Sequence, residues 1–275
     1  MHTSKLTVLI LASAIGALAS NMALAESTLD RVVGSKKLRC GIMMDNPPSG
    51  FRNAANEPDG LDVVYCKDMA KILGAEAEVV ETPSPDRIPA LVSNRIDVLI
   101  ASTTPTPQRA LTVAFTQPYM NFTMGVITRA DTGIKSYADL KGKKLGGVVG
   151  STQEQLINKE MEAGWAAAGS TYTGYASDAE SYLALQQGKV DSILVAMGVF
   201  NALSQSGQFS EFVLAGAAPL SDTVAIAVKR DDQQFLNWTK QFVWQQVTSG
   251  RFAEVYKTYF GDGPVPALAI SGVDY

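Results

Sequence analysis

Histidine and cysteine are scarce in this sequence, and the shortage excludes several kinds of reactive site. The chain has one histidine, His2, and two cysteines, Cys40 and Cys66. A Ser-His-Asp triad, a Cys-His pair and the usual zinc sites need histidine or free thiols. His2 lies in a segment that we expect to be removed, and the two cysteines are expected to be paired. We therefore predict no catalytic residues of these types, no metal site and no cofactor.

An excess of basic charge is also lacking. The chain has 23 basic and 27 acidic residues, for a net charge of −4. Lys5 is the only charged residue before Glu26, so the chain from Glu26 has 22 basic and 27 acidic residues and a net charge of −5. Nucleic-acid binding needs a basic surface. We expect no nucleic-acid partner.

The first 25 residues have the pattern of a cleaved secretory signal. His2 and Lys5 precede the apolar stretch 6–19, and "ALA" at 23–25 has the small residues that a signal peptidase recognises. The apolar stretch is short for the roughly 20 residues of a membrane-spanning helix. We expect a mature protein that starts at Glu26 and works in the periplasm.

Two cysteines in an exported chain favour a disulfide between Cys40 and Cys66. The alternative, a redox pair, usually has the spacing C-x-x-C. In the chain-entropy account, a structural disulfide with this loop would stabilise the fold by about 3 kcal/mol.

Strand and helix patterns alternate along the chain. The first half has strand patterns at 37–44, 77–82 and 96–102 and helix patterns at 60–74 and 84–94. The second half has strand patterns at 143–149, 170–175 and 189–196 and helix patterns at 151–168 and 178–188. This alternation predicts an α/β fold with parallel sheets covered on both faces.

Two further β-rich segments suggest how the halves are connected. Residues 122–129 and 223–230 contain no turn pair, so each could carry the chain from one lobe to the other. Helix patterns at 231–250 and 251–261 would then pack on the first lobe. The predicted division is a signal peptide (1–25), the first part of lobe 1 (26–124), lobe 2 (125–224), and a return to lobe 1 with C-terminal helices (225–275).

The stretch "STTPTPQRA", residues 102–110, follows a strand predicted to be buried. Ligands bind at the carboxyl ends of parallel strands, where a loop can lead into a helix. Thr106 suits the N-cap position and Pro107 the first helical position, which places Arg109 in the first turn. Hydroxyls, free helix N–H groups and a guanidinium at one edge of the sheet predict the capture of a carboxylate.

The second half offers a matching edge. In "GVVGSTQEQ", Gly150 ends a strand and Ser151-x-x-Glu154 forms a capping box that opens a helix. Ser151 and Thr152 are therefore candidates for ligand contact, although capping alone also explains them.

The sequence resembles the family-3 periplasmic solute-binding proteins of ABC importers for amino acids, over almost the whole mature length. The segments that carry the resemblance are "GLDVVYCKDMAKILG", "IPALVSNRIDVLIASTTPTPQRALTVAFTQPY", "YADLKGKKLGGVVGST", "ALQQGKVDSILVA" and "RFAEVYKTYFG". The second of these is the most specific. The resemblance implies a type II periplasmic binding protein fold, in which two lobes joined by two hinge strands close on a ligand.

The resemblance also implies roles for individual residues. Arg109 would hold a carboxylate, Ser102 and Thr104 would bind that carboxylate or an amine, and Thr152 would add a contact from lobe 2. Leu61 stands where the family usually has an apolar wall. The cysteine pair is similar to that of the general L-amino-acid-binding branch.

Three departures from the family concern the ligand. Ala196 stands where the family commonly has an aspartate for the ligand ammonium, Asn46 aligns with an aromatic residue, and Ser49 replaces a phenylalanine. A buried ammonium without a partner costs several kcal/mol. An amino-acid ligand therefore needs another carboxylate, for which Asp45 and Asp178 are candidates and Glu154 a weaker one.

We expect a monomeric binding protein that delivers an amino acid or a similar small carboxylate solute to an inner-membrane ABC permease. One alternative is a binding protein for an organic acid without an α-amine. Another is a dehydratase-like enzyme on the same fold, and a third is a sensory protein. No distinctive catalytic pairing supports an enzyme.

Overall fold

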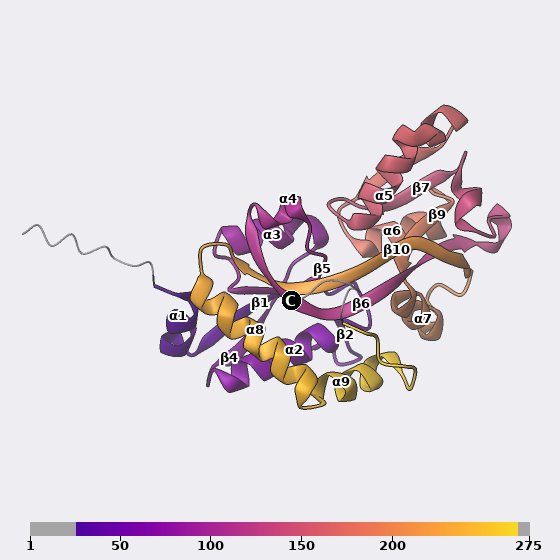
Figure 1. Cartoon of the computed structure of the whole chain (residues 1–275). Helices are drawn as coiled ribbons and strands as arrows, with labels where there is room; N and C mark the ends of the chain where they lie inside the picture. The colour runs from indigo at the N-terminus through magenta and orange to yellow at the C-terminus, as the bar shows by residue number, and fades with distance from the viewer. Residues whose placement is uncertain (1–25, 269–275) are drawn as a thin grey trace, which may run out of the picture.

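Two long strands, β6 (Val113–Arg129) and β10 (Phe212–Lys229), run antiparallel through the middle of the molecule (Figure 1). The computed structural model describes residues 26–268, so the predicted signal segment 1–25 lies outside the described part. The described chain forms two lobes joined by these strands, and one sheet of eight strands has the order β4-β1-β5-β10-β6-β9-β7-β8. The predicted two-lobe α/β architecture is confirmed.

Lobe 1 takes its elements from both ends of the chain. Its parallel strands are β1 (Lys37–Ile42), β4 (Glu76–Glu81) and β5 (Val98–Thr103). A short antiparallel pair consists of β2 (Phe51–Arg52) and β3 (Pro58–Asp59). Its helices are α1 (Thr28–Ser35), α2 (Leu61–Ile72), α3 (Arg87–Val92), α4 (Pro107–Ala110), α8 (Gln233–Thr248) and α9 (Arg251–Phe260). Helix α8 packs against β6 and helix α9 against α2, so the last helices complete the lobe that the first strands begin.

Lobe 2 is a single stretch of chain between the two long strands. Its strands are β7 (Lys144–Val148), β8 (Thr171–Tyr175) and β9 (Ser192–Ala196). Its α-helices are α5 (Thr152–Glu160), α6 (Asp178–Gln186) and α7 (Met197–Ser206). The predicted domain boundaries at 124/125 and 224/225 fall inside β6 and β10.

The helix predicted at 151–168 is shorter in the structure. Helix α5 ends at Glu160, and a π-helical turn (Met161–Trp165) and a 3-10 turn (Ala166–Ala168) follow. Gly164, inside the π-helical turn, has a non-helical φ of 114°, a conformation that glycine adopts without steric cost. Other 3-10 turns occupy Ser84–Asp86, Ala130–Thr132 and Tyr137–Leu140.

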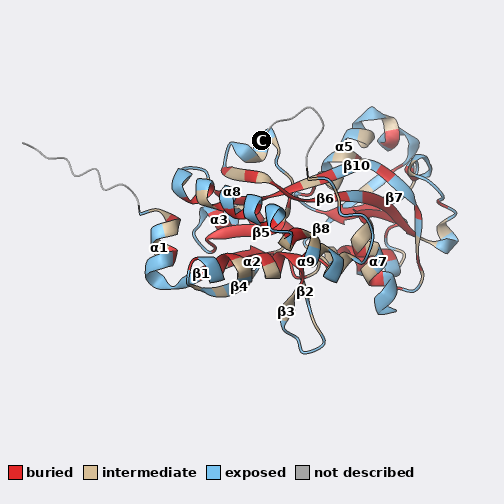
Figure 2. Ribbon diagram, turned by 60° about the horizontal axis from the view of Figure 1, so that its bottom comes forward, coloured by how far each residue is buried: buried red, intermediate tan, exposed pale blue. Residues whose placement is uncertain are grey.

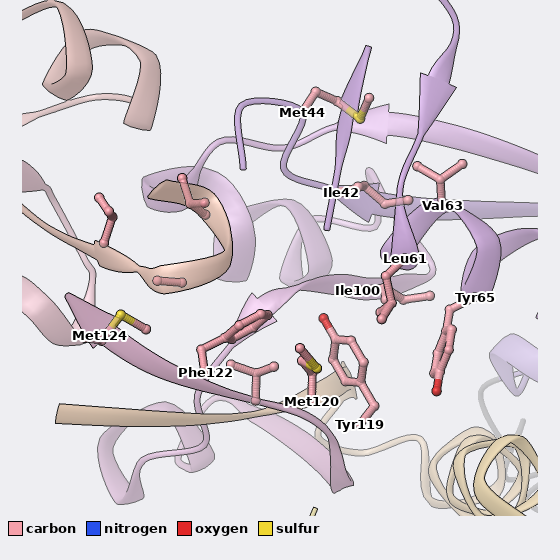
Figure 3. Close-up of a cluster of buried hydrophobic side chains, with 14 of the residues drawn as sticks. Ile42, Met44, Leu61, Val63, Tyr65, Ile100, Tyr119, Met120, Phe122 and Met124 are labelled. Carbon is pink, nitrogen blue, oxygen red and sulfur yellow. The ribbon is translucent and has the colours of Figure 1, made fainter. Parts of the chain in front are cut away.

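The sheet is buried between helices whose outer faces are exposed (Figure 2). Figure 3 shows part of the lobe 1 core, where the rings of Tyr65 and Tyr119 have centroids 5.5 Å apart. The predicted disulfide between Cys40 and Cys66 is present and joins β1 to α2. Within residues 26–268, no helix is both long and apolar enough to cross a bilayer.

Candidate functional site

A cavity lies between the two lobes, with the hinge strands at its base. It contains about 560 Å³ of space between protein atoms, part of it open to solvent. Phe122 and Met124 of β6 and Asp222 of β10 line it. The cavity brings together eight of the residues that the sequence analysis singled out: Asn46, Ser102, Thr104, Arg109, Ser151, Thr152, Asp178 and Ala196.

The carboxyl end of β5 forms the lobe 1 edge of the cavity. Ser102 has a positive φ of 45°, which is strained for a residue other than glycine. Three neighbours hold it: the Tyr119 hydroxyl accepts from its backbone N–H at 3.1 Å, Asn46 donates to its Oγ at 3.0 Å, and Arg87 donates to its carbonyl at 3.0 Å. The hydroxyl of Ser102 is therefore fixed at the cavity wall.

Arg109 reaches from this edge to the other lobe. As predicted, Thr106 is the N-cap of α4 and Pro107 its first residue, and the Thr106 hydroxyl accepts from the Arg109 N–H at 3.1 Å. The guanidinium donates to the Thr104 carbonyl at 2.7 Å and to the Gly150 carbonyl of lobe 2 at 2.6 Å. Burial lowers the pKa of Arg109 below its ordinary value, and the attraction of Asp222 opposes this shift. Arg109 is thus a cation in contact with both lobes.

Arg87 is a second arginine in the cavity, and it was not among the residues predicted from the sequence. Only 6% of its surface is exposed. Its guanidinium donates to the carbonyls of Ser84, Ala101 and Ser102 and to the Ser84 hydroxyl, at 2.7 to 3.1 Å. Burial lowers the pKa of Arg87 to about 10, and the neighbouring Arg109 adds to the shift. These bonds mark Arg87 as a scaffold residue that holds the end of β5.

The start of α5 forms the lobe 2 edge. Ser151 is the N-cap of this helix, and its hydroxyl accepts from the Glu154 N–H at 3.0 Å. The Glu154 carboxylate accepts from the N–H of Gly150 at 2.7 Å, one residue earlier than a capping box requires. Thr152 points its hydroxyl at Asp222, with 2.7 Å to each carboxylate oxygen.

Three carboxylates lie in or beside the cavity. Asp178 lines it, and burial, together with the nearby Asp45, raises the pKa of Asp178 to about 7. Asp45 lies next to the lining and accepts from the Ala179 N–H at 3.2 Å, so a lobe 1 carboxylate caps the lobe 2 helix α6. Burial raises the pKa of Asp45, and the Ala179 hydrogen bond opposes this shift. Asp222 is the third and was not predicted.

Leu61 is placed differently from the expectation, whereas Ala196 lies in the lining. Leu61 has no exposed surface and packs beside Ile100 in the lobe 1 core, so it does not line this cavity (Figure 3). Ala196 ends β9 and is 8% exposed in the lining, where it presents only a methyl group. A charge directly before the β-rich segment 223–230 was the available signal for Asp222. Arg87 had no comparable signal, because its role depends on carbonyls brought close by folding.

Within the described residues, no group of three or more His, Cys, Asp or Glu side chains could hold a metal ion.

The chain is similar to several known proteins over most of its length. Residues 38–262 match the sequence profile of the bacterial extracellular solute-binding proteins, family 3. The ABC transporter glutamine-binding protein of Bacillus subtilis (strain 168) is 28% identical over 268 residues, covering 94% of this chain and 95% of that protein.

Two solved structures share the fold. The cysteine-binding protein from Campylobacter jejuni is 26% identical with a TM-score of 0.78, covering 87% of this chain and 96% of that one. An ancestral amino acid-binding protein, a precursor of cyclohexadienyl dehydratase, is 25% identical with a TM-score of 0.74, covering 86% of this chain and all of that one.

The scaffold role of Arg87 predicts a stability difference between the two arginines. Arg87→Met should lower the free energy of unfolding by about 3 kcal/mol or more, because it leaves several buried carbonyls without donors. Arg109→Ala removes fewer bonds from a more exposed group, and we expect a loss of about 1 kcal/mol or less. Urea unfolding of both variants measures the difference, and equal losses would show that Arg87 is not a scaffold residue.

Proposed function

The chain belongs to family 3 of the bacterial extracellular solute-binding proteins, and we propose that it captures a small carboxylate-bearing solute, most simply an amino acid, for an ABC importer. The observation that carries this proposal is the position of Arg109 in a cavity between the lobes. The similar proteins with glutamine, cysteine or amino acids in their names support an amino acid as the solute. The partner would be a membrane permease, and the protein would act as a monomer.

Arg109 has donors left for a ligand. A guanidinium has five N–H groups, and two hydrogen bonds to the carbonyls of Thr104 and Gly150 leave three. A carboxylate accepts two parallel bonds from one guanidinium, which fixes its orientation as well as its charge. Ser102 and Thr104 on one side and Ser151 and Thr152 on the other would add hydroxyl contacts.

Binding at such a site favours closure of the lobes. A ligand that touches both edges interacts more strongly with the closed arrangement of the lobes than with an open one. This difference in affinity increases the fraction of molecules that are closed. Arg109 is central because it already contacts lobe 2 through Gly150. The hinge would be the antiparallel pair β6 and β10.

We place the working protein outside the inner membrane, with residues 1–25 acting as an export signal. The family is extracellular by description, and the charged and apolar pattern of these residues supports export. Mass spectrometry of protein purified from the periplasm should give a chain that begins at Glu26. A chain that retains Met1 in that fraction would contradict the cleavage.

Binding without chemical conversion is the activity that we propose. The precursor of a dehydratase among the similar structures raises the alternative of an enzyme. Asp178 is the side chain that favours it, because a pKa of about 7 suits a general acid at neutral pH. NMR spectra of a bound amino acid should stay unchanged after prolonged incubation with the protein. A product that forms with the wild type and not with Asp178→Asn would show catalysis.

Replacement of Arg109 tests whether this residue binds the carboxylate of the ligand. Thermal-shift screening of refolded, ligand-stripped protein should show stabilisation by amino acids or small organic acids, because a bound ligand raises apparent stability. Arg109→Ala should lose at least about 100-fold in affinity, and Arg109→Lys should recover only part of it, since lysine cannot form the paired bonds. Unchanged affinity in Arg109→Ala would show that Arg109 does not bind the ligand carboxylate.

A further inference from the structure

Asp222 lines the cavity without a cation in ion-pair contact, although the positive charges of Arg109 and Arg87 attract it from further away. It lies in the middle of the hinge strand β10, opposite Phe122 of β6, and is 5% exposed. No arginine or lysine nitrogen within residues 26–268 lies within 4.0 Å of its carboxylate. A buried carboxylate of this kind is costly unless other groups compensate its charge.

The compensation from the protein is incomplete. The Thr152 hydroxyl lies 2.7 Å from both oxygens of Asp222, but it has one hydrogen to donate. The Thr104 hydroxyl also stabilises the carboxylate. Together the two hydroxyls supply two hydrogens, whereas an ionised carboxylate accepts about four bonds. Burial raises the pKa of Asp222 in spite of the two hydroxyls and of the attraction of Arg109 and Arg87.

Asp222 also lies close to the group expected to hold a carboxylate. Thr104 connects the two, because its carbonyl accepts from Arg109 and its hydroxyl stabilises Asp222. Arg109 and Asp222 line the same cavity and both interact with Thr104. A cation and an anion this close together suit a ligand that carries opposite charges on neighbouring groups. An α-amino acid has this arrangement, since its carboxylate and ammonium are attached to the same carbon.

The geometry points to Asp222 as the residue that binds the ammonium of an α-amino acid whose carboxylate is held by Arg109. This inference rests on the proposed function and narrows its substrate class to zwitterions. The three N–H donors of an ammonium would complete the hydrogen bonds that the hydroxyls leave unmade. Ala196, which also lines the cavity, provides only a methyl group.

Asp178 is the other acid in the lining, and its surroundings suit this role less well. Burial and the negative charge of Asp45, which caps α6 beside it, raise the pKa of Asp178 to about 7. Asp178 therefore serves as a matched control, because it is an acid in the same cavity.

The first measurement uses ligand-stripped wild-type protein and does not depend on any variant. Isothermal titration calorimetry compares each standard L-amino acid that binds with the same acid carrying hydrogen in place of the amine, for example L-glutamine with glutaramate. We expect the amino acid to bind at least about 30-fold more tightly, the effect of losing one partner of a buried charge pair. Equal affinities would overturn the inference and leave the proposed function standing. Failure of every amino acid and organic acid to bind would instead refute the proposed function.

The second measurement asks which carboxylate causes the preference. Asp222→Asn should lower affinity for the amino acid by at least about 30-fold and change affinity for the amine-free acid by less than about 3-fold. Asp178→Asn should keep most of the preference. A preference that survives Asp222→Asn, or that is lost only in Asp178→Asn, would overturn the assignment. If the melting temperature shows that Asp222→Asn does not fold, Asp222→Ser, which keeps an acceptor for Thr152, replaces it.

Discussion

The antiparallel pairing of β6 with β10 is the constraint on which the rest of the structure depends. These strands belong to both lobes, and β10 lies between β5 and β6 in the sheet. Their paired residues Phe122 and Asp222 form part of the cavity base, so the element that joins the lobes also carries a charged wall of the site. Any rotation of one lobe against the other must bend or twist β6 and β10. Such a rotation changes the distance between the cavity edge at the start of α5 and the edge at the end of β5.

The buried charges around the cavity divide into those that hold the scaffold and those left for a ligand. Arg87 donates its hydrogen bonds to the carbonyls at the end of β5 and to Ser84. Asp45 accepts a hydrogen bond from the N–H of Ala179. Arg109 and Asp222 keep unused hydrogen-bonding capacity, and both interact with Thr104. A neutral zwitterion satisfies both, whereas a singly charged ligand satisfies one and leaves the other buried.

Local chemistry explains which features the sequence predicted. Thr106, Pro107 and Ser151 act within one helical turn, so a short stretch of sequence specifies their roles, and the structure agrees. Helix α7 was missed because it follows β9 directly, and its N-cap, Ala196, makes no side-chain capping bond. Leu61 was expected beside the ligand, but it packs in the core with Ile100 (Figure 3). Arg87 reaches the carbonyls of Ala101 and Ser102, and Asp222 meets Thr152, which lies 70 positions away, so only the folded chain shows these contacts.

The order of strands along the chain differs from their order in the sheet, and this affects how the chain folds. Lobe 2 is continuous, so its strands and helices can begin to assemble as soon as they have been synthesised. Lobe 1 cannot join β5 to β6 until residues 225–229 of β10 are available to lie between them. Contacts between segments so far apart in sequence are slow to form, because a long loop must close first. The first lobe to be synthesised is therefore the last to be completed, and until then the edges of β5 and β6 remain open to other chains.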